Sequence, residues 1–208
     1  MLPRPSLLTG LCTLAVAASA VAGPKFTSTW RAPGAAGTSF AGQKVIALVI
    51  ADDENLRISG EEALARELAG VGVPQAVPAY RVIPKEELRN VESARGWVER
   101  AGAAGVIALR PVKAEKGLVY TPSTWVNPYY SSLWGFYGYG WGALWDPGSV
   151  REDTVLVIET LIFGVRDGTL LWAGASETTN PKNLQKTVKD LVGATVKQMT
   201  KEGLVRKR

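Results

Sequence analysis

Residues 154–178, TVLVIETLIFGVRDGTLLWAGASET, decide the fold. The run 154–163 is apolar on both faces, which is typical of a central strand covered on each side. Asp167-Gly168 then predicts a two-residue hairpin, because this pair supplies the positive φ values of a type I′ turn. Residues 170–178 form the returning strand. This stretch therefore predicts an antiparallel hairpin near the centre of a sheet.

Upstream of the hairpin, buried-strand patterns alternate with helical ones. We expect strands at 44–50, 76–83 and 105–109, the last continuing in a more polar form to 121, and helices at 52–71 and 85–101. Downstream, Asn180-Pro181 predicts the cap and first turn of a last helix that ends near Gly203.

The expected fold class is α/β (α+β), with a single mixed five-stranded sheet and helices packed on it. The expected order is β-α-β-α-β, an aromatic loop, then β-β-α. Long connections predict parallel pairing in the first half, and the hairpin predicts antiparallel pairing in the second.

The N-terminal residues have the pattern of an export signal. Residues 7–18 are apolar but too few to span a bilayer, and Ala20-Val21-Ala22 matches an A-x-A cleavage site. We expect a signal peptide at 1–22 cleaved near Ala22, an extended lead-in at 23–43, and a single domain at 44–205 with an aromatic insertion at 121–150. The protein is then exported, and is periplasmic or associated with the outer membrane.

Lipid attachment is not expected. The single cysteine, Cys12, follows Thr9 and Leu11 where a lipobox wants a branched apolar and a small residue. Without Cys12 the exported chain has no thiol, which suits an oxidising compartment.

Composition excludes several classes of function. The chain has no His, so histidine acid–base catalysis, Ser-His-Asp triads and ordinary zinc sites are excluded. Neither a P-loop nor a G-x-G-x-x-G motif follows the first expected strand, so no nucleotide is expected. The net charge of +5 is mild and forms no basic stripe, so nucleic acid is not an expected partner. We expect no cofactor and no metal.

Residues 120–145 combine aromatic side chains with Gly, Pro and Ser. Their spacing indicates a long surface loop that exposes apolar area. Exposed Trp and Tyr can anchor a protein interface, stack on a sugar ring or lie at a lipid surface. Alternatively, the segment folds back and covers an open face or edge of the sheet. The candidate binding residues are Trp125, Tyr129, Tyr130, Trp134, Phe136, Tyr137, Tyr139, Trp141 and Trp145.

Two groups of carboxylates are further candidates. Asp52, Asp53 and Glu54 follow the first strand at its carboxyl end, where open α/β sheets bind ligands or divalent ions. Capping of the following helix explains the same residues.

Glu159 interrupts the apolar central strand, where an unpaired carboxylate is costly. The expected turn places it opposite Ser176 and beside Glu177, so that the two carboxylates could serve as a glycosidase acid and nucleophile. The other interpretation is an ion pair with Arg110 or Lys113 on a neighbouring strand.

Several short stretches carry a family resemblance: Thr29-Trp30-Arg31, residues 44–49, the Tyr/Gly/Trp-rich segment, and residues 169–174 followed by Ser176-Glu177. With these the chain resembles uncharacterised bacterial envelope proteins often described as lipoproteins. Such proteins look like relatives of the TolB N-terminal domain and of curli-secretion lipoproteins. The resemblance implies a periplasmic α/β module used in assembly. The poor lipobox at Cys12 departs from the family pattern.

Together these patterns predict a non-enzymatic exported envelope protein, a binding or assembly module whose aromatic loop contacts another envelope protein or itself. One alternative is a protein that binds or hydrolyses glycan with Glu159 and Glu177. A further alternative is a peripheral membrane anchor, so a glycan or a lipid surface is the other class of partner.

Overall fold

The computed structural model describes residues 24–114, 125–142, 155–179 and 183–205. The expected signal peptide at 1–22, with Cys12, lies outside these residues, as do Trp145 and the expected cap at Asn180.

The sheet has six strands in the order β1-β6-β5-β4-β2-β3. Their bounds are Lys25–Arg31 (β1), Lys44–Val49 (β2), Gln75–Pro78 (β3), Gly105–Ala114 (β4), Val155–Gly164 (β5) and Leu170–Thr179 (β6). β2 pairs in parallel with β3 and β4, and the other neighbours are antiparallel. The mixed sheet and the interior position of β5 are confirmed, whereas the expected number of five strands is wrong.

The additional strand is β1, which lies within the expected lead-in and pairs with β6 along the edge of the sheet. A register shift between Phe26 and Ser28 breaks the alternation of its side chains. Phe26 therefore packs against one face of the sheet, edge-on to Trp172, while Trp30 packs against the other.

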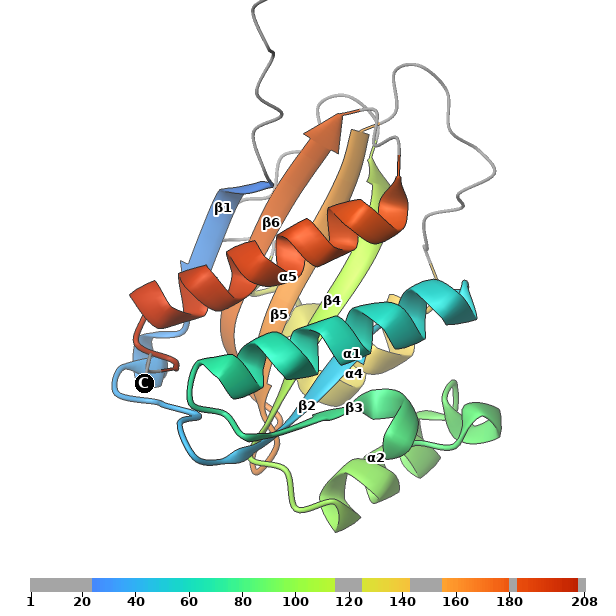
Figure 1. Cartoon of the computed structure of the whole chain (residues 1–208). Coiled ribbons are helices and arrows are strands. Elements are labelled where there is room, and N and C mark those ends of the chain that lie inside the picture. The colour runs from blue at the N-terminus through green and yellow to red at the C-terminus, as the bar shows by residue number, and fades with distance from the viewer. Residues whose placement is uncertain (1–23, 115–124, 143–154, 180–182, 206–208) are drawn as a thin grey trace, which may run out of the picture.

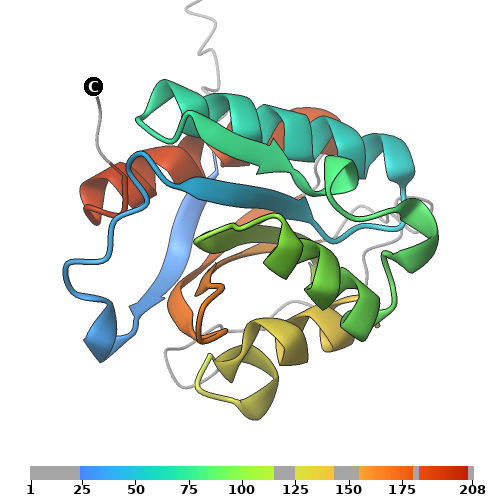
Figure 2. The same ribbon diagram turned by 90° about the horizontal axis from the view of Figure 1, so that it is seen from below.

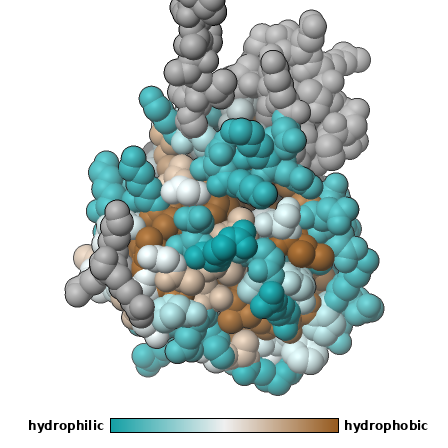
Figure 3. Space-filling view, viewed as in Figure 1, coloured by the Kyte–Doolittle hydropathy of each residue, from teal (hydrophilic) through white to brown (hydrophobic). Residues whose placement is uncertain are grey.

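Helices cover both faces of the sheet (Figures 1 and 2). On one face lie α1 (Glu54–Gly70) and α5 (Leu184–Lys201), and on the other lie α2 (Val91–Arg100), α3 (Pro128–Ser131) and α4 (Leu133–Gly140). Short 3-10 turns follow β1 and β3, namely η1 (Pro33–Ala35), η2 (Ala79–Arg81) and η3 (Lys85–Glu87). Figure 3 shows the face of α1 and α5, where hydrophilic and hydrophobic side chains are intermixed.

The helix starts follow local capping. The Asp53 side chain accepts a hydrogen bond from the Leu56 backbone N–H at 2.9 Å, so the capping interpretation of this residue is confirmed. Asn183, rather than Asn180, caps α5. The helix expected over 85–101 is instead η3 followed by α2, because Asn90 caps a new helix by accepting from Ser93 N–H.

The strand expected at 76–83 ends early, at Pro78. Proline has no N–H for a ladder, and the chain turns into η2 directly after it. β3 is therefore a short edge strand.

The turn between β5 and β6 also differs from its prediction. Gly164 N–H donates to the Thr169 carbonyl at 3.0 Å, so the turn contains four residues, 165–168, and not two. Gly168 adopts a φ of 65°, which the glycine permits. A further register shift between Ile162 and Phe163 sets the pairing of the remaining residues.

The connections of the parallel strands open the sheet at one edge. The chain leaves β2 through α1 to reach β3, and then returns through α2 to β4 on the other side of β2. Because α1 and α2 lie on opposite faces, the connections that leave β2 and β3 diverge outside the carboxyl ends of these two strands (Figure 2). Such a topological switch point is where open α/β sheets bind ligands.

Candidate binding surface on the aromatic segment

Residues 125–142, here called the aromatic segment, form two short helices on the face of the sheet opposite α1 and α5 (Figure 2). Asn127 caps α3 by accepting from Tyr129 N–H, and Pro128 occupies its first turn. Ser132 caps α4 by accepting from Gly135 N–H at 3.0 Å. The expectation of a loop without secondary structure is therefore wrong for this part of the chain.

One side of the segment is buried against the sheet. Trp125, Tyr130, Leu133, Phe136 and Tyr137 are buried in the same hydrophobic cluster as Val157, Leu161 and Phe163 of β5. The ring of Phe136 stacks on that of Phe163, with 5.6 Å between the centroids. The prediction that these aromatic side chains are exposed is thus wrong for Trp125, Tyr130, Phe136 and Tyr137. The alternative, a segment that covers the sheet, is what the structure has.

Glycine allows α4 to approach the sheet closely. A Cβ atom on Gly140 would lie 2.9 Å from the Ile50 Cδ1 atom, and one on Gly138 would lie 3.1 Å from Val91 Cγ2 of α2. The glycines that obscured the helix in the sequence are therefore the residues that let it dock.

A buried polar cluster fastens the segment to the sheet. Arg110 Nε donates to Glu159 Oε2 at 2.6 Å. The Tyr130 hydroxyl donates to Glu159 Oε1 at 2.8 Å and accepts from Arg110 Nη2 at 3.1 Å. All three side chains are buried. Burial, reinforced by the neighbouring Glu159 carboxylate, raises the pKa of Tyr130, so this hydroxyl keeps its proton as a donor.

The Arg110 guanidinium also contacts aromatic rings. Its Cζ atom lies 5.5 Å from the centroid of Phe136 and 5.3 Å from that of Tyr139. These cation–π contacts link the buried ion pair to the outward side of the segment.

A second set of contacts joins the segment to the connection before α2. The Tyr137 hydroxyl donates to the Leu88 carbonyl, and Arg89 lies over the Trp141 ring at 5.3 Å. Burial, and then the nearby Glu61, raise the pKa of Tyr137. The end of α4 therefore lies near the carboxyl end of β2 and beside the connection before α2.

The outward side presents apolar groups. Val126, Tyr129 and Tyr139 are 60%, 54% and 42% exposed. The rings of Tyr129 and Tyr139 stack on each other, with a centroid distance of 4.7 Å and an interplanar angle of 20°. Trp134 and Trp141 are partly buried. Of the candidate residues, Tyr129 and Tyr139 are thus the most accessible, and binding by them stays a prediction. Val126 was not singled out from the sequence, because valine carries no such signal.

The carboxylates of the central hairpin are not brought together as expected. Glu159 pairs across the strands with Ala175, and not with Ser176, because the longer turn and the register shift displace the pairing by one residue. Both Glu159 oxygens accept hydrogen bonds, from Arg110 and Tyr130, whereas Glu177 is exposed opposite Val157. The prediction of an ion pair between Glu159 and Arg110 is confirmed.

The acidic residues after β2 are paired with cations. Asp52 pairs with Arg89, and Glu54 with Lys85 at 2.6 Å. Over the described ranges, no group of three or more His, Cys, Asp or Glu side chains is arranged to hold a metal ion.

No protein-family model matches the chain, and no curated protein sequence matches it. Among solved structures, a PelC dodecamer from Paraburkholderia phytofirmans is 12% identical with a TM-score of 0.44, over 86% of this chain and 96% of that chain. A second PelC dodecamer from the same organism is 13% identical with a TM-score of 0.43, over 81% and 92%. Lipoprotein GNA1162 from Neisseria meningitidis is 16% identical with a TM-score of 0.38, over 76% and 96%. TM-scores of this size do not establish a shared fold.

A search for membrane-spanning helices among the described residues finds none of sufficient length and hydropathy.

Proposed function

We propose that the chain is a non-enzymatic, exported protein of the bacterial cell envelope that acts as a binding or assembly module. Its contact surface is the outward side of the aromatic segment, and its partner is another envelope protein. The observation that carries this proposal is the location of the exposed apolar side chains. In the part of the chain that the structure describes, the large hydrophobic side chains that are exposed are Val126, Tyr129 and Tyr139, all on this segment.

The surface is held in place before any partner arrives. Tyr129 and Tyr139 stack on each other, and Tyr139 also meets Tyr130 edge-on at 6.4 Å. Tyr130 is fixed by its hydrogen bonds to Glu159 and Arg110. Aromatic side chains that are already ordered lose little conformational entropy on binding, which is why Tyr is common at the centres of interfaces.

The composition of the segment favours a protein partner. Residues 125–142 contain no Asp, Glu, Lys or Arg, so binding is not steered by charge as it would be for an acidic glycan or an anionic lipid. Valine and tyrosine side chains instead offer apolar area with phenol hydroxyls, the mixture found at protein interfaces.

Export is supported by the sequence alone. The apolar run 7–18 and the A-x-A pattern at Ala20-Val21-Ala22 have the length and order of a secretory signal.

The test is photo-crosslinking in living cells from a reactive residue placed at Tyr129. The matched control carries the same residue at Glu67, which is exposed on α1 on the opposite face of the sheet. A discrete protein adduct is expected from position 129 and not from position 67.

A second variant checks that the aromatic pair carries the contact. With the crosslinker moved to Val126, the double change Tyr129→Ser and Tyr139→Ser is expected to remove the adduct while the chain still unfolds cooperatively. An adduct of twice the chain's own mass would identify the partner as a second copy. Capture of glycan or lipid alone, or no adduct at all, would overturn the proposal of a protein partner.

A further inference from the structure

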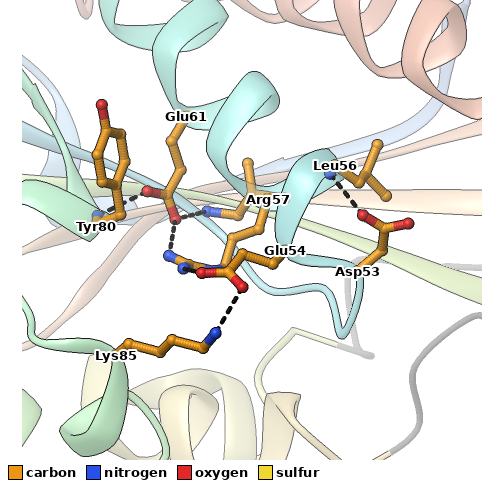
Figure 4. A network of polar contacts seen from close by, with 8 residues as sticks. Asp53, Glu54, Leu56, Arg57, Glu61, Tyr80 and Lys85 are labelled. Carbon is orange, nitrogen blue, oxygen red and sulfur yellow. Dashed lines mark hydrogen bonds and ion pairs between the residues drawn. The ribbon is translucent and has the colours of Figure 1, made fainter.

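A second site lies where β2 and β3 separate. The parallel pairing of β2 and β3 ends at Ala47 and Pro78. If it continued, Val49 would pair with Tyr80 two residues further along. Instead, Glu61 of α1 accepts hydrogen bonds from both of their backbone N–H groups, at 3.3 and 2.8 Å (Figure 4). A side-chain carboxylate thus satisfies the two donors that the parting strands leave unpaired. The separation of the strands is therefore stable, and it leaves space outside their carboxyl ends.

A cavity of about 290 Å³ lies next to this separation, outside the carboxyl end of β2. Its charged and aromatic lining comes from α1, from the connection before α2 and from the end of the aromatic segment. These lining residues are Asp52, Glu54, Arg57, Lys85, Glu86, Arg89 and Trp141. A cavity of this size is at the lower end of the range for small-molecule sites.

The wall formed by Arg57 has an unused donor. The Arg57 side chain is only 5% exposed, and its Nη1 makes no hydrogen bond to any of the described residues. Its ion-pair partners lie beyond hydrogen-bond distance, with Glu61 Oε1 at 3.6 Å and Glu54 Oε1 at 4.0 Å. Arg57 also lines the cavity, and these two carboxylates do not take up the hydrogen-bonding capacity of its guanidinium, which favours an acceptor supplied by a ligand. The acceptors that a guanidinium binds best are carboxylate and phosphate oxygens.

Two further cationic side chains, Lys85 and Arg89, line the same cavity and can contact a ligand there. Lys85 and Arg89 are about two-thirds exposed, and each is paired with an exposed carboxylate, Glu54 or Asp52. Such surface pairs contribute little to stability, so a ligand oxygen can replace the carboxylate at small cost. The N-terminus of α1 adds a partial positive charge, since Asp53 uses only the Leu56 N–H of its first turn.

We propose that this cavity binds a small anionic molecule through a phosphate or carboxylate group held by Arg57, Lys85 and Arg89. Binding there involves neither Tyr129 nor Tyr139, so it is independent of the aromatic contact surface.

The experiment titrates the chain from residue 23 onward with inorganic phosphate and, separately, with succinate, at constant ionic strength, and follows backbone amide NMR shifts. Saturable shifts are expected at residues 52–57 and at the Trp141 indole N–H. Saturation by phosphate alone or by succinate alone identifies which oxyanion the site takes, and either result supports the proposal.

Variants separate this site from general attraction of anions. The double change Lys85→Gln and Arg89→Gln is expected to weaken binding about tenfold or more, since two charge-assisted contacts are lost. The control is Arg95→Gln with Lys186→Gln, which removes the same charge from two exposed ion pairs far from the cavity. Arg57→Lys keeps the buried charge but loses the planar fork, and is expected to weaken binding while Tm stays near that of the parent.

Two results would overturn the proposal. One is the absence of saturable shifts at residues 52–57 with both probes. The other is an equal loss of affinity in the Arg95 and Lys186 control.

Discussion

Among the described residues, two Arg–Glu pairs are buried, one on each face of the sheet, and they differ in the distance between their charged groups. Arg110 and Glu159 are in direct contact at 2.6 Å, and the Tyr130 hydroxyl bridges them. Arg57 and Glu61 are equally buried, but their nearest charged atoms are 3.6 Å apart. The two carboxylate oxygens of Glu61 instead accept hydrogen bonds from the backbone N–H groups of Val49 and Tyr80.

The difference shows what each pair does. Arg110 and Glu159, here called the closed pair, are hydrogen-bonded to each other and to Tyr130 of the aromatic segment. These hydrogen bonds offset the cost of removing the two charges from water, and they hold the segment on the sheet. Arg57 and Glu61, here called the open pair, make no hydrogen bond to each other at 3.6 Å, and Arg57 also lines the cavity. A buried charged side chain whose hydrogen bonds are all formed within the protein has a structural role. A buried charged side chain that keeps hydrogen-bonding capacity next to a cavity can bind a ligand.

The largest effect is expected from breaking the closed pair. Glu159→Leu leaves the Arg110 guanidinium buried without its carboxylate, which should lower the free energy of unfolding by about 3–5 kcal/mol. Adding Arg110→Leu removes the stranded charge, so the double variant should recover most of that loss. Denaturant unfolding of the parent, the single and the double variant measures this.

The recovery is the decisive observation. If the double variant is as unstable as the single one, the cost comes from lost packing around residue 159, and the ion pair does not hold the segment.

The second largest effect is expected from the open pair, as a dependence of the free energy of unfolding on pH. Burial raises the pKa of the Glu61 carboxyl from 4.5 to about 7, against hydrogen bonds from Tyr80 and Val49 that lower it. Within this window the folded chain binds a proton that the unfolded chain has released. The free energy of unfolding therefore falls as the pH rises between these two values and levels off above them, by up to about 3 kcal/mol.

Urea unfolding across this pH range, for the parent and for Glu61→Gln, isolates the contribution of this carboxyl. The parent curve should fall more steeply than that of the variant. Parallel curves would mean that the pKa of Glu61 is not raised in the folded chain.

The sequence predicted much of the sheet because its interior strands are continuous apolar runs. β2 and β5 were placed within one residue, and the start of α1 within two. The edge strand β1 was missed since its register shift breaks the two-residue alternation on which strand prediction rests. Glu159 was expected to pair with Arg110 or Lys113, because a carboxylate inside an apolar strand needs a cation, and the partner is Arg110.

The candidate site was predicted less well, for a reason visible in its residues. Tyr130, Leu133, Tyr137 and Gly140 recur at helical spacing and are all buried, but the intervening glycines hid this pattern. The sequence pointed to the carboxyl end of β2 through Asp52 and Glu54, which line the cavity. Its cations could not be added from the sequence, because Arg57 and Lys85 are far apart in the chain and lie together only through the connections around β2.

The smallest of the three effects comes from Tyr130, and it separates the holding role of the segment from its proposed binding role. Tyr130→Phe keeps the ring but removes a donor to Glu159 and an acceptor for Arg110, so it should cost about 1–3 kcal/mol of unfolding free energy. Tyr129→Phe, in the stacked and exposed ring next to it, should leave stability unchanged, because its hydroxyl makes no hydrogen bond to the described residues. Chemical denaturation of the two variants measures the contrast. Equal stability of the pair would show that the hydroxyl bridge contributes nothing, and that packing of the aromatic rings alone keeps the segment on the sheet.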